Sequence, residues 1–209
     1  MSPSGTIRAF AAVPLSEDAR SRLGALVEEL APAASDSVRW VKPEAMHMTL
    51  RFLGDTRPEA AADFFRALAA SPALAGGPIE LHLAGVTAFP DSDRPRVIVA
   101  LAREPTGRLA GIAAAAEELA RAAGYPREER GFRAHITLGR AKDDRRRGAR
   151  RPPRDRSSPS GRGDLARALA ERASLDLGLS FVSEVVLFRS DLAPGGATYT
   201  ALDRIPLAG

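Results

Sequence analysis

The sequence predicts an α+β fold built from two related lobes, and three observations support this. The chain of 209 residues is long enough for two small lobes that share one core. The tetrapeptide His-apolar-Thr-Leu occurs twice, as His47–Leu50 and as His135–Leu138. Around each copy, the predicted elements follow a strand-strand-helix-strand theme. We therefore expect a single domain over 1–209 with two pseudo-symmetric antiparallel sheet lobes and outer helices.

The first half of the chain alternates between the two-residue period of strands and the 3.6-residue period of helices. Leu23, Leu26 and Leu30 recur at helical spacing after Ser16, which is a typical N-cap residue. Pro32 is expected to end that helix. The predicted elements are a strand over 6–13, the helix between Ser16 and Pro32, a strand over 38–41, the first His strand up to Gly54, and a helix over 60–70.

The second half begins with a strand in which Ile79, Leu81 and Leu83 share one face, followed by a turn and a second strand. Gly124 ends the next helix, and the second His strand follows. Asp164 is a plausible cap of a last short helix. The predicted elements are strands over 78–89 and 96–101, a helix over 108–123, a helix over 165–173, and strands over 181–188 and 198–205.

Composition excludes several kinds of protein. The chain has no cysteine, which excludes disulfides, thiolate metal sites and cysteine nucleophiles. No apolar run approaches the roughly 20 residues that a membrane-spanning helix needs. The N-terminal stretch MSPSGTIRAF lacks the pattern of a signal peptide. We expect a cytoplasmic protein that does not bind membranes. A monomer is expected because no unexplained apolar stripe stands out.

The net charge of +4 is concentrated in one segment. Between Lys142 and Arg156, eight Lys and Arg side chains accompany three Asp side chains, so the rest of the chain is nearly neutral. The surrounding stretch is rich in Pro, Gly and Ser and almost lacks apolar residues. This composition predicts a flexible Arg/Pro-rich insertion over 143–163 outside the core.

Both His motifs lie in runs that alternate apolar and polar residues, so His and Thr share the polar face of a half-buried strand. If the two strands are neighbours in one sheet, that face surrounds one space with His47, Thr49, His135 and Thr137. Imidazole titrates near neutrality, so a pair supplies one base and one acid, as phosphodiester cleavage requires. The two hydroxyls can donate hydrogen bonds to phosphate oxygens.

Three further residues are candidates for binding a substrate. Arg133 has the strand parity of His135 and is a candidate phosphate clamp. Arg51 shares the parity of Thr49 but lies further along its strand, toward the rim of the site. Trp40 can stack on a base, although such a tryptophan is more often a core residue.

The same residues also have interpretations other than catalysis. A single His on a strand is more often structural, but two in one repeated context with a paired Thr favour catalysis. A zinc centre lacks a third His, a Cys or a carboxylate at ligand spacing, so we expect neither metal nor cofactor. His82 lies on the polar face of its strand and is expected to be incidental. The arginine segment can bind RNA phosphates, but it has no aromatic stacking platform.

Two His-x-Thr-x motifs in a chain of this length resemble the signature of the two-histidine (2H) phosphoesterases. Nearly the whole chain is similar to the bacterial and archaeal RNA 2′,3′-cyclic phosphodiesterases, also called 2′-5′ RNA ligases; the Arg/Pro-rich insertion is the exception. The matching stretches are IRAFAAVPL, VRWVKPEAMHMTLRFLGD, GVTAFPDSDRPRVIVA, FRAHITLGR and VVLFRSDLAPGGATYTALDRIPL.

The resemblance implies a bilobal fold with a central cleft and metal-independent hydrolysis of a ribose 2′,3′-cyclic phosphate to a 2′-phosphomonoester. It implies His47 as the proton donor to the leaving 3′-oxygen and His135 as the proton acceptor from water. Thr49 and Thr137 would hold the phosphate. The partners would be RNA or nucleotides with 2′,3′-cyclic phosphate ends. The alternatives are 2′-5′ ligation of tRNA-half-like ends and a non-catalytic RNA-binding protein.

Overall fold

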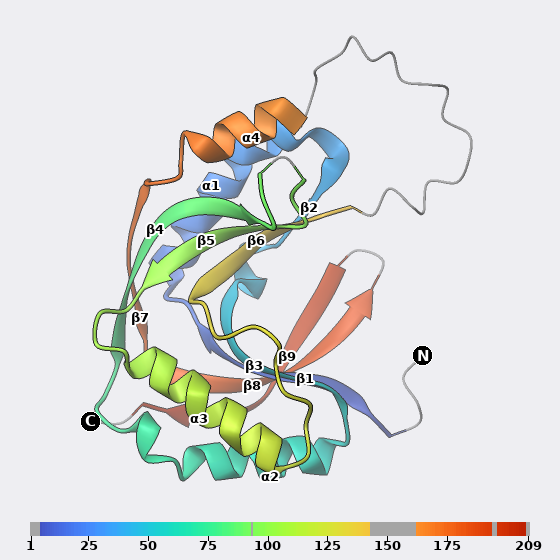
Figure 1. Cartoon of the computed structure of the whole chain (residues 1–209), viewed down its shortest axis with the longest axis vertical. Coiled ribbons are helices and arrows are strands. Elements are labelled where there is room, and N and C mark those ends of the chain that lie inside the picture. The colour runs from blue at the N-terminus through green and yellow to red at the C-terminus, as the bar shows by residue number, and fades with distance from the viewer. Residues whose placement is uncertain (1–4, 93, 143–161, 194–195, 208–209) are drawn as a thin grey trace.

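The computed structural model describes residues 5–92, 94–142, 162–193 and 196–207. The predicted insertion over 143–163 lies outside these ranges except for its last two residues. Within them, two antiparallel sheets stand at the centre and pairs of helices cover their outer faces (Figure 1). The predicted α+β class and the two sheet lobes are confirmed.

The first sheet has the strand order β3-β1-β8-β9, and the second has the order β2-β6-β5-β4-β7. In both sheets, each pair of neighbouring strands is antiparallel. The strands of the first sheet are β1 (Ile7–Pro14), β3 (His47–Thr56), β8 (Glu184–Ala193) and β9 (Gly196–Pro206). Those of the second sheet are β2 (Val38–Trp40), β4 (Ile79–Phe89), β5 (Val97–Arg103), β6 (His135–Ala141) and β7 (Asp176–Val182).

The helices are exchanged between the lobes. Helix α1 (Glu17–Ala34) follows the first strand of the first sheet, yet it packs with α4 (Arg162–Ala170) against the second sheet. Helix α3 (Arg108–Ala122) follows β5 of the second sheet, yet it packs with α2 (Pro58–Ala69) against the first sheet (Figure 1). Each lobe is therefore completed by a helix whose flanking strand belongs to the other.

The cores lie between the sheets and these helices. Apolar side chains at helical spacing, such as Leu23, Leu26 and Leu30 of α1, are buried, as the sequence predicted. On α2, the largest buried side chains are Phe64 and Phe65. No helix in the described ranges is long and apolar enough to cross a membrane.

One strand prediction is wrong. The sequence pattern predicts a single strand over 181–188, but the chain forms two strands there, β7 and β8, in different sheets. The chain leaves the second sheet at Ser183, whose carbonyl accepts a hydrogen bond from the backbone of Leu207. Strand β7 is not predicted because polar residues interrupt its apolar pattern. One of them, Ser180, is nevertheless fully buried, and its hydroxyl contacts Ser16.

The ends of α1 also differ from expectation. Ser16 occupies the N-cap position, but its hydroxyl makes no capping bond and lies 3.2 Å from the hydroxyl of Ser180 instead. Pro32 does not end the helix, which continues to Ala34. The carbonyl of Pro32 accepts a hydrogen bond from the N–H of Ser35, so the last turn closes although the proline itself has no donor.

Candidate active site

The two His strands do not neighbour each other in one sheet. Strand β3 forms an edge of the first sheet, β6 lies inside the second, and the two strands contact each other where the lobes meet. His47 and Thr49 therefore come from one lobe, and His135 and Thr137 come from the other. We call these four residues the inter-sheet site.

The two imidazoles are held in the same way. Nδ1 of His47 lies 2.8 Å from the carbonyl oxygen of Ala45, and Nδ1 of His135 lies 2.6 Å from that of Arg133. In both cases the acceptor is two residues upstream of the histidine. A carbonyl oxygen only accepts hydrogen bonds, so each Nδ1 carries a proton. Each neutral ring therefore keeps Nε2 as its free acceptor.

Both strands contain an irregularity directly after the threonine. In β3, Thr49 and Arg51 pair with consecutive residues of β1, so Leu50 is the extra residue. In β6, Thr137 and Gly139 pair with consecutive residues of β5, so Leu138 is the extra residue. A bulge of this kind reverses the alternation of faces downstream. Phe52 and Arg140 therefore follow the threonines onto the face of the inter-sheet site.

The hydroxyls of Thr49 and Thr137 are available to a ligand. Both side chains are half-buried. Neither hydroxyl has a hydrogen-bonding partner in the part of the chain that the structure describes. Two backbone-anchored imidazoles and two uncommitted hydroxyls at one junction favour a ligand rich in acceptor oxygens.

His47 is enclosed by aromatic rings of the first sheet. Its imidazole stacks on Phe10 at a centroid distance of 4.8 Å and meets Tyr199 edge-on at 4.9 Å, with Phe188 at 5.9 Å. Burial lowers the pKa of His47 to about 4, although the hydrogen bond to the Ala45 carbonyl opposes this shift.

Electrostatic interactions with Arg140 and His135 also contribute to the lowered pKa of His47. Both residues lie on β6, so the second lobe acts electrostatically on an imidazole of the first. Strict alternation along the strand assigns Arg140 to the face opposite Thr137. The bulge at Leu138 adds one residue, so Arg140 lies on the same face as Thr137 instead. The repeated motif contains a signal that could identify both residues, because Phe52 follows His47 at the same sequence separation as Arg140 follows His135.

Arg133 lies beside the second histidine, as expected from the sequence. Its guanidinium carbon is 5.5 Å from the ring centroid of Phe89, and that ring meets His135 edge-on at 6.0 Å. The side chain is exposed. Arg133 is therefore placed to reach a ligand of the inter-sheet site. To do so, its guanidinium would have to leave the cation–π contact with the Phe89 ring.

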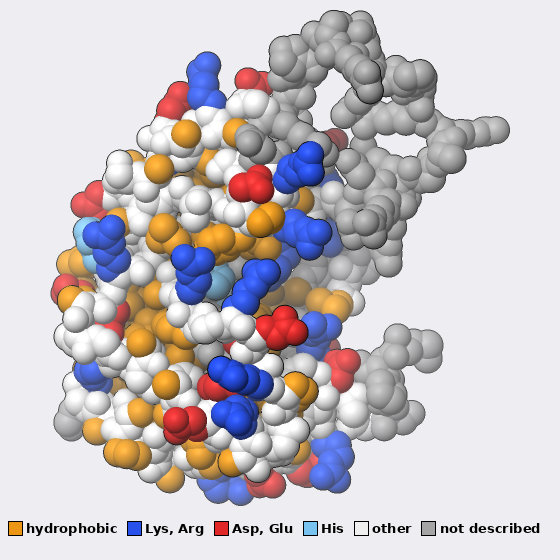
Figure 2. Space-filling model, in the orientation of Figure 1, with side chains coloured by type: hydrophobic (Ala, Val, Ile, Leu, Met, Phe, Trp, Pro, Cys, Tyr) orange, Lys and Arg blue, Asp and Glu red, His pale blue; other side chains and the backbone are white. Residues whose placement is uncertain are grey.

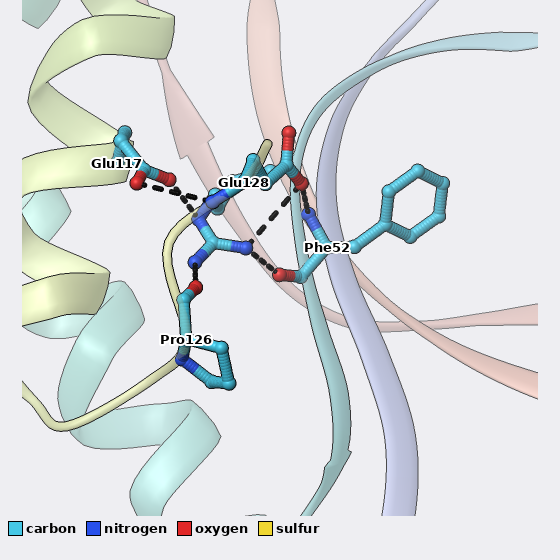
Figure 3. A network of polar contacts seen from close by, with 5 residues as sticks. Phe52, Glu117, Pro126 and Glu128 are labelled. Carbon is cyan, nitrogen blue, oxygen red and sulfur yellow. Dashed lines mark hydrogen bonds and ion pairs between the residues drawn. The ribbon is translucent and has the colours of Figure 1, made fainter. Parts of the chain in front are cut away.

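The expected position of Arg51 is wrong. The bulge turns its side chain away from Thr49 and to the buried side of β3. Figure 3 shows the polar network found there, with Phe52, Glu117, Pro126 and Glu128 labelled. Its Nε lies 2.6 Å from Glu117 of α3, and its Nη1 lies 3.3 Å from Glu128. The guanidinium also donates to the carbonyls of Phe52 and Pro126. Arg51 therefore joins β3 to α3 and to the segment that leads to the second His motif.

Trp40 belongs to the core rather than to a stacking surface. It packs against the main cluster of buried residues. A Cβ at Gly139 would lie 2.8 Å from the Trp40 ring and 2.7 Å from Val38, so these three residues share the inner face of the sheet. His82 is exposed, and its Nε2 lies 2.9 Å from Asp176. Neither residue joins the inter-sheet site.

The described residues contain no group of three or more His, Cys, Asp or Glu side chains that could hold a metal ion. The polar groups around the inter-sheet site are imidazoles, hydroxyls and guanidinium groups. These groups donate hydrogen bonds and positive charge, which suits an anion.

Comparisons with known proteins agree with this geometry. Residues 13–99 match the family model described as LigT like Phosphoesterase. The chain is 33% identical over 210 residues to an RNA 2′,3′-cyclic phosphodiesterase of Thermus thermophilus, covering 97% of this chain and 91% of the relative. It is 29% identical to the protein of that name from Methanothermobacter thermautotrophicus, covering 94% of this chain and 97% of the relative.

Solved structures show the same architecture. A Thermus thermophilus crystal structure superposes with a TM-score of 0.71 at 28% identity, covering 96% of this chain and 98% of that one. Escherichia coli LigT complexed with 3′-AMP gives a TM-score of 0.72 at 23% identity, covering 98% and 99% of the two chains. Together with the curated relatives, these likenesses show that the chain belongs to the LigT-like two-histidine phosphoesterase family, which includes the RNA 2′,3′-cyclic phosphodiesterases.

Proposed function

We propose that this protein hydrolyses the 2′,3′-cyclic phosphate at the end of an RNA to a 2′-phosphomonoester by general acid–base catalysis. The observation that supports it most directly is the matched pair of His-x-Thr motifs, each with Nδ1 fixed on a backbone carbonyl and Nε2 left free. The names of the relatives, RNA 2′,3′-cyclic phosphodiesterase, support the choice of substrate.

The proposed reaction uses one imidazole on each side of the phosphorus. Nε2 of His135 takes a proton from a water molecule, whose oxygen forms a new bond to phosphorus. The bond from phosphorus to the ribose O3′ breaks, and His47 gives its proton to that oxygen. The products are a free 3′-hydroxyl and a 2′-phosphomonoester, and the two histidines have exchanged their protonation states.

Thr49, Thr137 and Arg140 act on the non-bridging oxygens in this proposal. The two hydroxyls donate hydrogen bonds to these oxygens, and the guanidinium of Arg140 balances the charge that develops on them. Phe52 offers an exposed ring on the same face of β3, with Phe10 behind it at a centroid distance of 5.7 Å. We assign it to stacking on the terminal base, because aromatic rings stack on any base.

The low pKa of His47 bears on its role as the acid. Near neutral pH the ring is neutral in the free protein, because burial disfavours the imidazolium. A bound cyclic phosphate brings a negative charge next to the ring, which raises the pKa and favours the protonated form. We therefore expect the group that must be protonated to have a higher apparent pKa in the pH profile of kcat than in that of kcat/KM.

The direct test is turnover of a nucleoside 2′,3′-cyclic phosphate, with the 2′- and 3′-monophosphate products resolved. Wild type should form the 2′-product in the presence of EDTA. His47→Ala and His135→Ala should each lower kcat on the order of 100-fold or more. His82→Ala is the matched control, because this exposed imidazole lies outside the inter-sheet site, and its rate should equal that of wild type. Normal turnover by either site variant would refute the assigned roles.

A further inference from the structure

A second arginine stands beside Arg140 on the same face of the sheet. Arg39 of β2 pairs directly with Arg140 of β6 in the antiparallel register. Directly paired residues project on the same side of a sheet. The neighbouring residues Val38, Trp40 and Gly139 occupy the inner face, where a Cβ on the glycine would strike both side chains. Arg39 and Arg140 therefore share the opposite face, which continues into the inter-sheet site.

This pair of like charges has no compensating partner among the described residues. Both arginines are exposed. Neither guanidinium makes an ion pair or hydrogen bond with any residue that the structure describes. Like charges directly opposite each other destabilise a sheet, so the arrangement carries a cost unless an anion binds there. Figure 2 shows Lys and Arg side chains gathered on the face where a histidine lies near the middle of the molecule.

The two arginines differ in their distance from the reacting phosphate. Arg140 follows Thr137 onto the face of the inter-sheet site, and its charge acts on His47. Arg39 lies one strand further out, on the edge strand of the sheet, which is about 5 Å away in the direction of the ladder. Arg133, the other exposed arginine beside the motifs, already lies over the Phe89 ring. Within the described ranges, Arg39 is thus a cation beside the inter-sheet site that makes no ion pair.

We propose that Arg39 binds the phosphodiester immediately 5′ of the terminal nucleotide and thereby makes the protein prefer RNA ends to free cyclic mononucleotides. This inference rests on the proposed function, because it takes the reacting phosphate to lie at Arg140 and the two histidines. The terminal nucleotide then spans the site, and the next phosphate of the chain meets the outer arginine.

The test compares two substrates that differ by one internucleotide phosphate. Adenosine 2′,3′-cyclic phosphate has none, and the dinucleotide ApA ending in a 2′,3′-cyclic phosphate has one. Arg39→Ala should lower kcat/KM about 10-fold for the dinucleotide, which is the effect of one lost hydrogen bond to a charged group. For the mononucleotide the change should be less than about 2-fold, and Arg39→Lys should recover most of the loss.

Salt dependence gives a second readout of the same contact. For the dinucleotide, the slope of log kcat/KM against log salt should be less steep in Arg39→Ala by about 0.7, because one single-strand phosphate contact is lost. Arg66→Ala is the matched control, since Arg66 is an exposed arginine on the outer helix of the other lobe and its guanidinium pairs with Asp63. This control should leave both substrates and both slopes unchanged.

Two outcomes would overturn the inference. An equal loss of kcat/KM on both substrates would mean that Arg39 acts on the reacting phosphate or on the fold. No loss of kcat/KM on either substrate would mean that Arg39 is only a solvated surface residue. Failure of wild type to hydrolyse the mononucleotide would contradict the proposed function instead. In that case, the binding of a dinucleotide that ends in a 2′-phosphate tests the role of Arg39. A lower affinity of Arg39→Ala for this dinucleotide would support the contact, and an affinity equal to that of wild type would refute it.

Discussion

At the scale of single residues, the environment of each imidazole decides what it can do. His47 is surrounded by aromatic rings that exclude water, whereas His135 has one ring beside it and lies next to an exposed arginine. The sequence context of the two histidines is the same, yet their surroundings differ. The aromatic partners of His47 come from β1, β8 and β9, whereas that of His135 comes from β4.

The low pKa of His47 predicts a pH-dependent stability. The folded-state pKa of about 4 lies below the ordinary value of 6.5, so the unfolded chain binds this proton first as the pH falls. Stability is complete above about pH 6.5 and declines as the pH falls toward 4. From pH 7 to pH 5, wild type should lose about 2 kcal/mol of unfolding free energy through this group.

Urea denaturation of wild type and His47→Gln at the two pH values measures this loss. The variant should show a smaller decline, by about the same 2 kcal/mol. His82→Gln is the matched control, because His82 is exposed and should leave the decline unchanged. Equal declines in wild type and His47→Gln would show that His47 is not buried in its neutral form.

At the scale of elements, the two bulges after the threonines determine the site. They bring Phe52 and Arg140 to the ligand side and turn Arg51 to the helix side. The buried Arg51 then fixes the backbone around Phe52. Glu128, which pairs with Arg51, also accepts a hydrogen bond of 3.0 Å from the Phe52 N–H (Figure 3). The network thus ties a residue of the site to α3.

Replacing Arg51 tests this network. Arg51→Met should lower the free energy of unfolding by about 3 kcal/mol, because it leaves Glu117 and Glu128 without their partner, both of which still reach some solvent. Chemical denaturation measures the loss. The exposed pair of Arg66 and Asp63 is the control, and Arg66→Ala should cost less than about 1 kcal/mol.

A triple variant separates charge from packing in the same network. Adding Glu117→Gln and Glu128→Gln to Arg51→Met removes the unpaired carboxylates, so it should recover part of the lost stability. If the single variant is as stable as wild type, the network does not join β3 to α3 in the way we describe.

At the scale of the whole molecule, the site exists only because two lobes meet. Each lobe supplies one histidine and one threonine, and exchanged helices hold the lobes together. Neither lobe carries both histidines by itself. Catalysis is therefore expected to depend on both lobes as one unit rather than on the sum of two independent contributions.

Combining the two histidine substitutions tests this dependence. The double variant His47→Ala/His135→Ala should be about as slow as the slower single variant, because residues that act as a unit lose their effect together. Single-turnover rates with a cyclic dinucleotide measure this. If the two losses multiply, each histidine contributes independently, and the coupled acid–base scheme is wrong.

Sequence alone determined the fold class, most element boundaries and the four residues at the centre. The apolar periodicities of β3, α2 and α3 are strong because each element has one buried face. The repeated tetrapeptide identified His47, Thr49, His135 and Thr137 as candidates, and the family resemblance is confirmed. Their catalytic roles stay predictions, as does the nature of the insertion over 143–163.

Tertiary structure decided what periodicity cannot express. A bulge adds one residue to a strand and reverses the faces after it, so parity misplaced Arg51 and overlooked Arg140. Local pattern also cannot say which sheet a strand joins, so β7 and β8 merged into one predicted strand. The low pKa of His47 depends on rings from distant strands. Burial and charge at the site arise from contacts between segments that are far apart in the chain.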